Sequence, residues 1–232
     1  MISLAVKYRP KEWEDVTEQK SIIKILNNQI ESGNIKNSLL FSGKSGSGKT
    51  TCARLLANKL GCIPIEIDAA SNNGVDNVRN IIIEAQERSL SSKYKIFIFD
   101  EAHMLSTAAW NAMLKIIEEP PQYTIFIFCT TDPQKIPTTI LNRVQRYNFT
   151  NISYSGILNR LIYILEQEYI SYDLDALEYI AKLADGSMRE AISLVDQVID
   201  YSPIINMENT ICALGNYSYD YFFKLVKRLC RR

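Results

Sequence analysis

The octapeptide GKSGSGKT (Gly43–Thr50) is the stretch that most limits how this chain folds, because it matches the phosphate-binding pattern G-x-x-x-x-G-K-[S/T]. The apolar run SLLFS precedes it and the helix-like TTCARLLANKL follows from Thr50, which is the strand–loop–helix context that the pattern requires. Glycines let the backbone wrap around phosphate, and the helix start directs N–H groups and a positive dipole end toward it. The alternative is a Gly/Ser turn without a ligand.

The pattern therefore predicts a nucleotide-phosphate site. We expect Lys49 to reach the β- and γ-phosphates and Thr50 to ligate Mg²⁺. The binding residues predicted from this loop and the start of its helix are Gly43, Lys44, Ser45, Gly46, Ser47, Gly48, Lys49, Thr50 and Thr51.

Short apolar runs alternate with helical patterns in the first two thirds of the chain. The predicted strands are 38–43, 63–68, 95–100, 124–130 and 144–149. The nearly continuous apolar runs at 95–100 and 124–130 are typical of parallel strands covered on both faces. Apolar residues at three- and four-residue spacing predict helices over Lys49–Leu60, Asp76–Ser89 and Thr107–Glu118. The alternation predicts an α/β domain over 1–150, with helices on both faces of a parallel sheet.

After residue 150 the strand signal stops. Three amphipathic segments, separated by Ser, Asp and Gly, predict a small three-helix domain over 151–203. The remaining segment, 204–232, suggests one or two more helices.

Composition excludes several other classes of protein. The chain has 232 residues, 47% of them hydrophobic, with 26 Lys and Arg against 26 Asp and Glu, so any DNA contact must be local. Its apolar runs are too short to span a bilayer and its first residues do not resemble a signal peptide, so we expect a soluble cytoplasmic protein. Five scattered cysteines and one histidine, His103, argue against a disulfide framework and a structural zinc site.

Two carboxylates lie at the carboxyl end of the predicted strand in KIFIFDEAH (95–103), where ligands of parallel sheets bind. We expect Asp100 to hold the Mg²⁺ shell and Glu101 to orient the attacking water. Each acid alone could instead cap a helix or lie at the surface. His103 is expected to make local hydrogen bonds rather than to act as a base. A helicase, which DEAH suggests, would need a second RecA-like domain, and the segment after residue 150 is too short for one.

Five further segments narrow the class of NTPase. They are KYRPKEWEDVTEQ, IEIDAASNNGVDNVR, DEAHMLSTAAWNAMLKIIEEPP, CTTDPQKIPTTILNRV and DGSMREAISLVDQ. In this order, from about Leu4 to the end, they closely resemble bacterial clamp-loader gamma/tau subunits (the DnaX family of DNA polymerase III). More distantly they resemble replication factor C subunits. An AAA+ protein of branch migration or recombination is the remaining alternative.

The resemblance implies an AAA+ ATPase: a nucleotide-binding α/β domain, a three-helix lid, and in 204–232 the start of a helical collar that holds a five-subunit ring. Such rings use ATP and Mg²⁺ to open a sliding clamp and place it on primer-template DNA. The competing hypothesis is a nucleotide-binding scaffold subunit that hardly hydrolyses ATP.

The resemblance also assigns residues around the nucleotide. Those that would line the adenine and ribose pocket are Tyr8, Arg9, Pro10, Val16 and Thr17, whose alternative role is plain N-terminal packing. Thr131 matches the first sensor, which holds the lytic water or contacts the γ-phosphate; alternatively it caps the next turn. Arg189 matches the second sensor, which bridges the lid to the phosphates, but it could equally be a surface charge.

Two more sites follow from the resemblance. The candidates for contact with template DNA are Ser71, Asn72, Asn73 and Arg79, and the alternative is N-capping of the following helix by Asn or Asp. Arg143 matches the arginine of the family's Ser-Arg-Cys motif, which acts in trans on the next subunit's ATP. Here Asn142 and Val144 flank it.

The chain departs from the family pattern in two respects. The four-cysteine zinc module is missing and only Cys62 stands in its place, so we predict no zinc. The chain also ends at Arg232 after about one collar helix. It is either a shortened piece or a compact variant, for example from a phage, and both put assembly into a stable ring in doubt.

Overall fold

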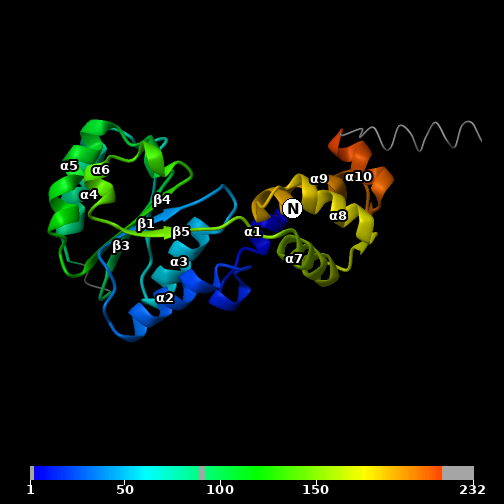
Figure 1. The fold of residues 1–232 in the computed structure, drawn as a ribbon, viewed down its shortest axis with the longest axis horizontal. Helices are drawn as coiled ribbons and strands as arrows, with labels where there is room; N and C mark the ends of the chain where they lie inside the picture. Colours follow the sequence, from blue (N-terminus) through cyan, green and yellow to red (C-terminus); the bar gives the residue numbers. More distant parts are fainter. Residues whose placement is uncertain (1–2, 89–91, 216–232) are drawn as a thin grey trace, which may run out of the picture. The chain divides into compact units, whose positions relative to one another are not determined.

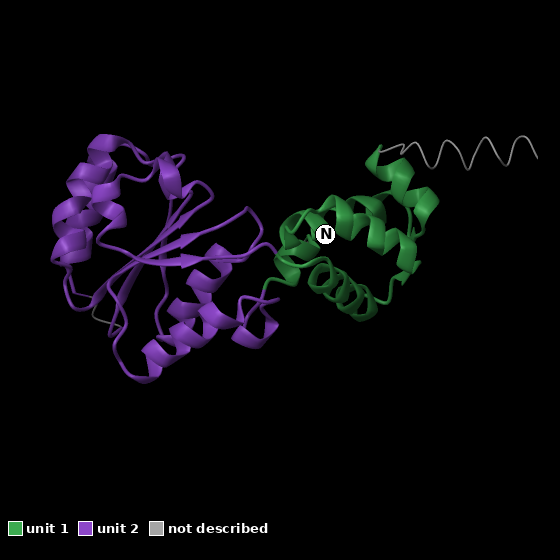
Figure 2. Ribbon diagram, viewed as in Figure 1, with its two compact units in different colours: residues 1–9, 152–232 green, residues 10–151 purple. Residues whose placement is uncertain are grey.

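The structure, a computed structural model, describes residues 3–88 and 92–215. It divides into two compact units, which Figure 2 shows in different colours. We call residues 10–151 the α/β unit, and residues 1–9 together with 152–232 the helical unit.

A five-stranded parallel sheet forms the centre of the α/β unit, with strand order β2-β3-β4-β1-β5. The strands are β1 (Ser38–Ser42), β2 (Ile65–Asp68), β3 (Lys95–Asp100), β4 (Thr124–Thr130) and β5 (Gln145–Asn148). They are the predicted strands, with ends shifted by at most two residues. Their carboxyl ends share one edge of the sheet, and this edge carries the phosphate loop.

Helices cover both faces of this sheet (Figure 1). The helices of the unit are α2 (Lys20–Glu31), α3 (Lys49–Lys59), α4 (Val75–Gln86), α5 (Thr107–Glu118) and α6 (Thr138–Leu141), with the 3-10 turns η1 (Trp13–Asp15), η2 (Ala102–Met104) and η3 (Pro133–Lys135). One core lies between the sheet, α4 and α5, and the other between the sheet, α2 and α3.

The central strands divide their side chains between these cores by simple alternation. In β3, Phe97 and Phe99 enter the core of α4 and α5, whereas Ile96 and Ile98 enter the other. Strand β4 does the same with its two Phe and two Ile residues. All eight side chains are at most 1% exposed. Burial of each stabilises the fold by roughly 1.5–3 kcal/mol, so the sheet is a rigid platform for the loops at its edge.

The helical unit contains the three predicted lid helices, α7 (Tyr154–Gln167), α8 (Leu174–Leu183) and α9 (Met188–Tyr201). Ser153 and Ser187 cap α7 and α9, accepting hydrogen bonds from the N–H groups of Gly156 (3.1 Å) and Glu190 (3.2 Å). A short β-bridge joins β6 (Ser171–Tyr172) to β7 (Ile204–Ile205).

Two further helices pack onto this unit. Helix α1 (Leu4–Lys7), predicted to belong to the α/β domain, instead buries Leu4 among the lid helices, and the N–H of Leu4 donates to Asp196 at 3.1 Å. Helix α10 (Met207–Leu214), assigned above to the collar, packs on α9, where Gln197 donates to the carbonyl of Ala213 at 3.0 Å. The rest of the predicted collar, 216–232, lies outside the described residues.

A search of the described residues finds no helix that combines the length and apolar character needed to span a membrane.

Candidate nucleotide site

The phosphate loop leaves β1 at Gly43, and only glycine fits there. The N–H of Gly43 donates to the carbonyl of Thr130 at 3.2 Å. Its φ is 152°, and a Cβ at this position would lie 2.5 Å from the carbonyl oxygen of Phe149. The loop thus runs close under the end of β5. It ends at Gly48, which has φ 100° and directly precedes α3.

The Lys49 ammonium lies inside the turn of this loop. Its Nζ donates to the carbonyl oxygens of Gly43 (2.8 Å) and Lys44 (2.9 Å), and the residue is 6% exposed. Burial lowers the pKa of Lys49, while the nearby carboxylates of Glu101 and Asp100 raise it. An ammonium removed from water in this way is stabilised by an anion.

A second feature of the loop fits a phosphate group. The Ser47 hydroxyl is buried and has no hydrogen-bond partner among the described residues. Such orphaned groups are costly in a folded protein unless a ligand or water satisfies them. Lys49 and Ser47 together therefore provide charge and hydrogen-bonding capacity inside the loop.

Thr50 and Asp100 meet at the predicted Mg²⁺ position. The Thr50 hydroxyl lies 3.2 Å from each carboxylate oxygen of Asp100, although the residues are 50 positions apart. Hydroxyl and carboxylate oxygens suit Mg²⁺, which commonly takes one or two protein ligands and completes its shell with water and phosphate. Correspondingly, no group of three or more His, Cys, Asp or Glu side chains that could hold a metal occurs within residues 3–88 and 92–215.

Glu101 and Thr131 form the next pair along the same edge. The Thr131 hydroxyl donates to Oε2 of Glu101 at 3.0 Å. Glu101 has φ 46°, a left-handed conformation that costs an ordinary residue about 1–2 kcal/mol and is often found at functional sites. His103 lies 3.1 Å from the Thr130 hydroxyl and 3.4 Å from Glu101, so it makes the local contacts predicted for it.

Gln19 belongs to this site and was missed by the sequence analysis. It is 6% exposed, and its carboxamide pairs with the backbone of Thr150, donating to the carbonyl at 2.7 Å and accepting from the N–H at 3.3 Å. The same amide nitrogen reaches the carbonyl of Ser47 at 3.5 Å. Gln19 thus ties the phosphate loop to the end of β5. No local pattern marks a lone glutamine before a helix for this role.

The predicted adenine-pocket residues are divided between the two units. Pro10, Val16 and Thr17 belong to the α/β unit, whereas Tyr8 and Arg9 belong to the helical unit.

Tyr8 is bound within the helical unit. Its hydroxyl donates to Glu168 and its carbonyl accepts from Arg160 at 3.2 Å. Burial, and then the hydrogen bond to Glu168, raise the pKa of Tyr8 to about 12. These are contacts within the helical unit, and the role of Tyr8 beside the base and ribose stays a prediction. Arg189, near the start of α9, is an exposed member of the same unit.

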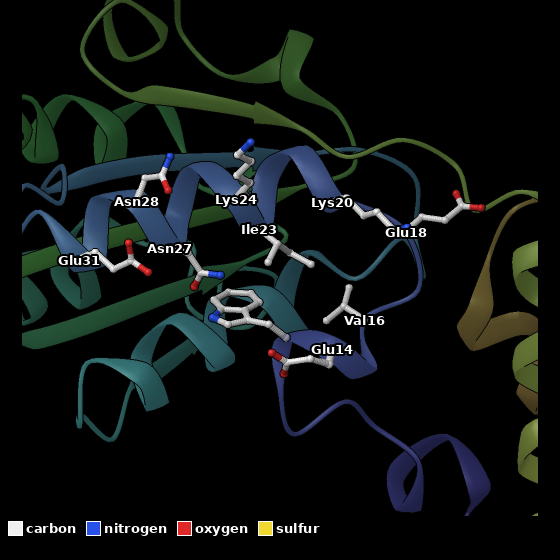
Figure 3. Close-up of a pocket in the computed structure, with 10 residues that line it drawn as sticks. Glu14, Val16, Glu18, Lys20, Ile23, Lys24, Asn27, Asn28 and Glu31 are labelled. Carbon is white, nitrogen blue, oxygen red and sulfur yellow. The ribbon is translucent and has the colours of Figure 1, made fainter.

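Val16 lines a groove of about 440 Å³ between η1 and α2 (Figure 3). Polar side chains of α2, among them Lys20, Lys24 and Asn27, form much of its wall. No residue of the phosphate loop lines it, so the groove is separate from the phosphate site.

Two of the four predicted DNA-contacting residues, Ser71 and Asn72, form a turn around Asp68, the last residue of β2. Asp68 accepts a hydrogen bond from the Ser71 hydroxyl (2.6 Å), and its carbonyl accepts one from the Asn72 amide (3.1 Å). The hydrogen bonds from Ser71 and from the N–H of Ala70 lower the pKa of Asp68. The alternative of an Asn or Asp cap on the next helix is wrong, because Gly74 precedes α4 without a side-chain cap.

The other two residues of this group make separate contacts. Asn73 is exposed, and its carbonyl accepts from the N–H of Ser106 at 3.2 Å. Arg79 is exposed and pairs with Asp76 at 3.0 Å.

Arg143 lies at the edge of the sheet opposite the phosphate loop. Strand β5 runs parallel to β1 with Gln145 beside Leu39, so Arg143 precedes the level at which β1 begins. About 17 Å of strand separates that level from Gly43. The guanidinium pairs with Glu118 and donates to the carbonyl of Thr139 at 2.6 Å. Arg143 is therefore not placed to serve its own phosphate loop.

The fold, together with the phosphate loop and the two acids at the carboxyl edge of the sheet, defines a P-loop nucleoside triphosphatase of the AAA+ class. The Holliday junction branch migration motor RuvB of Thermotoga maritima has the same fold, with a TM-score of 0.75 and 21% identity over 90% of this chain and 72% of that chain. A family model described as DNA polymerase III, delta subunit, matches residues 64–153, and one described as DNA polymerase III clamp loader subunit, ATPase lid domain, matches residues 156–203.

Curated relatives identify the family. The chain is 40% identical to DNA polymerase III subunit tau of Bacillus subtilis over 96% of its own length, and 37% identical to DNA polymerase III subunit gamma of Buchnera aphidicola (subspecies Schizaphis graminum) over 97%. It spans 44% of the first relative and 69% of the second. The chain belongs to the family of gamma and tau subunits of bacterial DNA polymerase III, as its motifs indicated.

Proposed function

We propose that this chain is an ATP-binding and ATP-hydrolysing subunit of a sliding-clamp loader, which couples ATP binding to clamp opening and to clamp placement on primer-template DNA. One observation carries the catalytic part of the proposal. Beside the buried Lys49 ammonium, the two acids at the carboxyl end of β3 each have a hydroxyl partner, Thr50 for Asp100 and Thr131 for Glu101. Family membership supports the rest.

In this proposal Lys49 binds the β- and γ-phosphates of ATP, and Thr50 and Asp100 hold Mg²⁺. The metal would neutralise charge on the phosphate oxygens. Glu101 orients the attacking water, and the Thr131 hydroxyl holds the Glu101 carboxylate in place. No zinc takes part.

The remaining contacts to the nucleotide in this proposal are those that family membership suggests. Tyr8, Arg9, Pro10, Val16 and Thr17 surround the base and ribose, and Arg189 contacts the phosphates.

The partners in this proposal are other clamp-loader subunits, the clamp and DNA. Arg143 acts on the ATP of a neighbouring subunit, where such arginines typically contribute about 10³–10⁵ in rate. Backbone phosphates of DNA are bound without base recognition by the turn and helix that carry Ser71, Asn72, Asn73 and Arg79. A replication role of this kind implies a cytoplasmic location.

The test separates binding from hydrolysis. Binding of a fluorescent, non-hydrolysable ATP analogue is measured by titration, and ATPase turnover is measured with and without partner subunits, clamp and primed DNA. We expect binding by the isolated chain and turnover that the partners stimulate, with Lys49→Ala abolishing both. Binding without turnover in any mixture would instead identify the nucleotide-binding scaffold.

A further inference from the structure

Glu118 contacts the guanidinium of Arg143, to which the proposed function gives a role in trans, and the inference drawn from this contact rests on that role. Glu118 is the last residue of α5, and Arg143 follows α6. A carboxylate oxygen of Glu118 pairs with Nε of Arg143, and Nη1 donates to the carbonyl of Thr139 at 2.6 Å. Two contacts from separate segments thus fix the guanidinium.

The position of Glu118 is unfavourable for its own helix. The C-terminal end of a helix carries partial negative charge, and acidic side chains in the last turn are disfavoured there. Helix α5 nevertheless ends with Glu118 followed by Glu119. The ion pair to Arg143 is the stabilising interaction that the structure gives the Glu118 carboxylate.

The two contacts do not cover the guanidinium. A guanidinium has five N–H donors in a planar fork; Glu118 lies on the Nε side of the Arg143 fork, and Nη1 donates to the carbonyl of Thr139. The Arg143 side chain is 37% exposed, so part of the guanidinium is accessible to an anionic group outside the chain. A long surface side chain ordinarily samples many rotamers, and restricting it beforehand favours binding in a defined geometry.

We propose that Glu118 is a positioning residue for Arg143. It holds the guanidinium so that its exposed edge meets the γ-phosphate bound by the neighbouring subunit. Glu118 does not itself contact nucleotide.

The experiment is a double-mutant cycle on the full chain, assembled with its partner subunits. Glu118→Gln keeps the shape of the side chain and removes its charge, Arg143→Ala removes the finger, and the third variant carries both. Glu119→Gln is the matched control, because it removes a carboxylate from the same helix end. Stimulated ATPase kcat, KM for ATP and ATP-analogue binding by the isolated chain are measured for each.

We expect Glu118→Gln to lower kcat by roughly 10- to 100-fold, the loss typical of a misplaced catalytic group. It should leave KM and analogue binding unchanged, and it should have no further effect when Arg143 is already Ala. Glu119→Gln should turn over like the wild type.

The other outcomes each refute a different step. Full turnover by Arg143→Ala, or no turnover by the wild type, overturns the proposed finger and with it the role of Glu118. A loss in Arg143→Ala without a loss in Glu118→Gln overturns the role of Glu118 alone. Faster turnover of Glu118→Gln would mean that Glu118 masks the finger, and an additional loss in the double variant would mean that Glu118 acts through another residue.

Discussion

Gly43→Ala tests whether the phosphate loop is held rigidly against the end of β5. The new Cβ would lie 2.5 Å from the carbonyl oxygen and 2.9 Å from the Cβ of Phe149, far inside van der Waals contact. This neighbour cannot rotate away, because its N–H donates to the carbonyl of Ser42 at 2.7 Å within the sheet. Either the loop or the end of β5 must move.

The cost has two parts. Overpacking of a well-ordered site costs about 1–3 kcal/mol, and a non-glycine residue in a sparsely populated backbone region about 1–3 kcal/mol more. The sum, roughly 2–6 kcal/mol, is a large fraction of the ~5–15 kcal/mol by which a domain is stable. We therefore expect Tm to fall by roughly 5–15 °C and affinity for an ATP analogue to fall with it.

Alanine variants at two other glycines separate the steric part of this cost from the backbone strain. Gly33 has φ 66° with nothing within 4 Å of an added Cβ, so Gly33→Ala should cost only the backbone strain, about 1–2 kcal/mol. Gly74 has φ −76° and open space, so Gly74→Ala should be neutral or stabilising by up to ~1 kcal/mol. The assay is thermal unfolding followed by circular dichroism. Equal losses in Gly43→Ala and Gly33→Ala would refute the rigid contact with Phe149.

Three further predictions concern the nucleotide site and the helical unit. Glu101→Gln should keep analogue binding and reduce stimulated turnover by about 10²–10⁴-fold, and normal turnover would exclude Glu101 as the group that activates water. Burial lowers the pKa of Lys49 in the folded chain below 10.5, its value in the unfolded chain. Between these two pKa values the unfolded chain binds more protons, so the contribution of Lys49 to stability is smallest below the lowered pKa and rises with pH. Urea unfolding between pH 7 and 10.5 should therefore show that the free energy of unfolding of the wild type rises relative to that of Lys49→Met as the pH increases. A difference between the two proteins that does not change with pH would contradict the burial of Lys49. The pKa of Tyr8 is raised from 10.0 to about 12, so its contribution is complete below pH 10 and lost as the pH rises through 12. Absorbance titration should show that Tyr8→Phe lacks one late-titrating phenol, whereas loss of an early-titrating phenol would contradict the Glu168 contact.

Local patterns in the sequence were sufficient to predict the strands of the α/β unit, its helices α3, α4 and α5, and the edge of the sheet that carries the phosphate loop. The alternation of Ile and Phe in β3 and β4 predicted strands buried on both faces, because successive side chains of a strand point to opposite sides. The phosphate loop and the acids at the carboxyl end of β3 were predicted to meet, since the carboxyl ends of parallel strands share one edge. The contact of Thr50 with Asp100 is the result.

The sequence by itself thus determined the class of fold, the phosphate loop and the pair of acids. Tertiary structure decided how the side chains around them are held. Gln19 contacts Thr150 across 131 positions, Leu4 contacts Asp196 across 192, and the partner of Arg143 is Glu118 from another helix. Such contacts depend on strand order, helix packing and side-chain rotamers, and the residue pattern within one segment does not predict these. This is why the sequence could mark Arg143 as a candidate finger, while only the folded chain reveals the carboxylate that holds it.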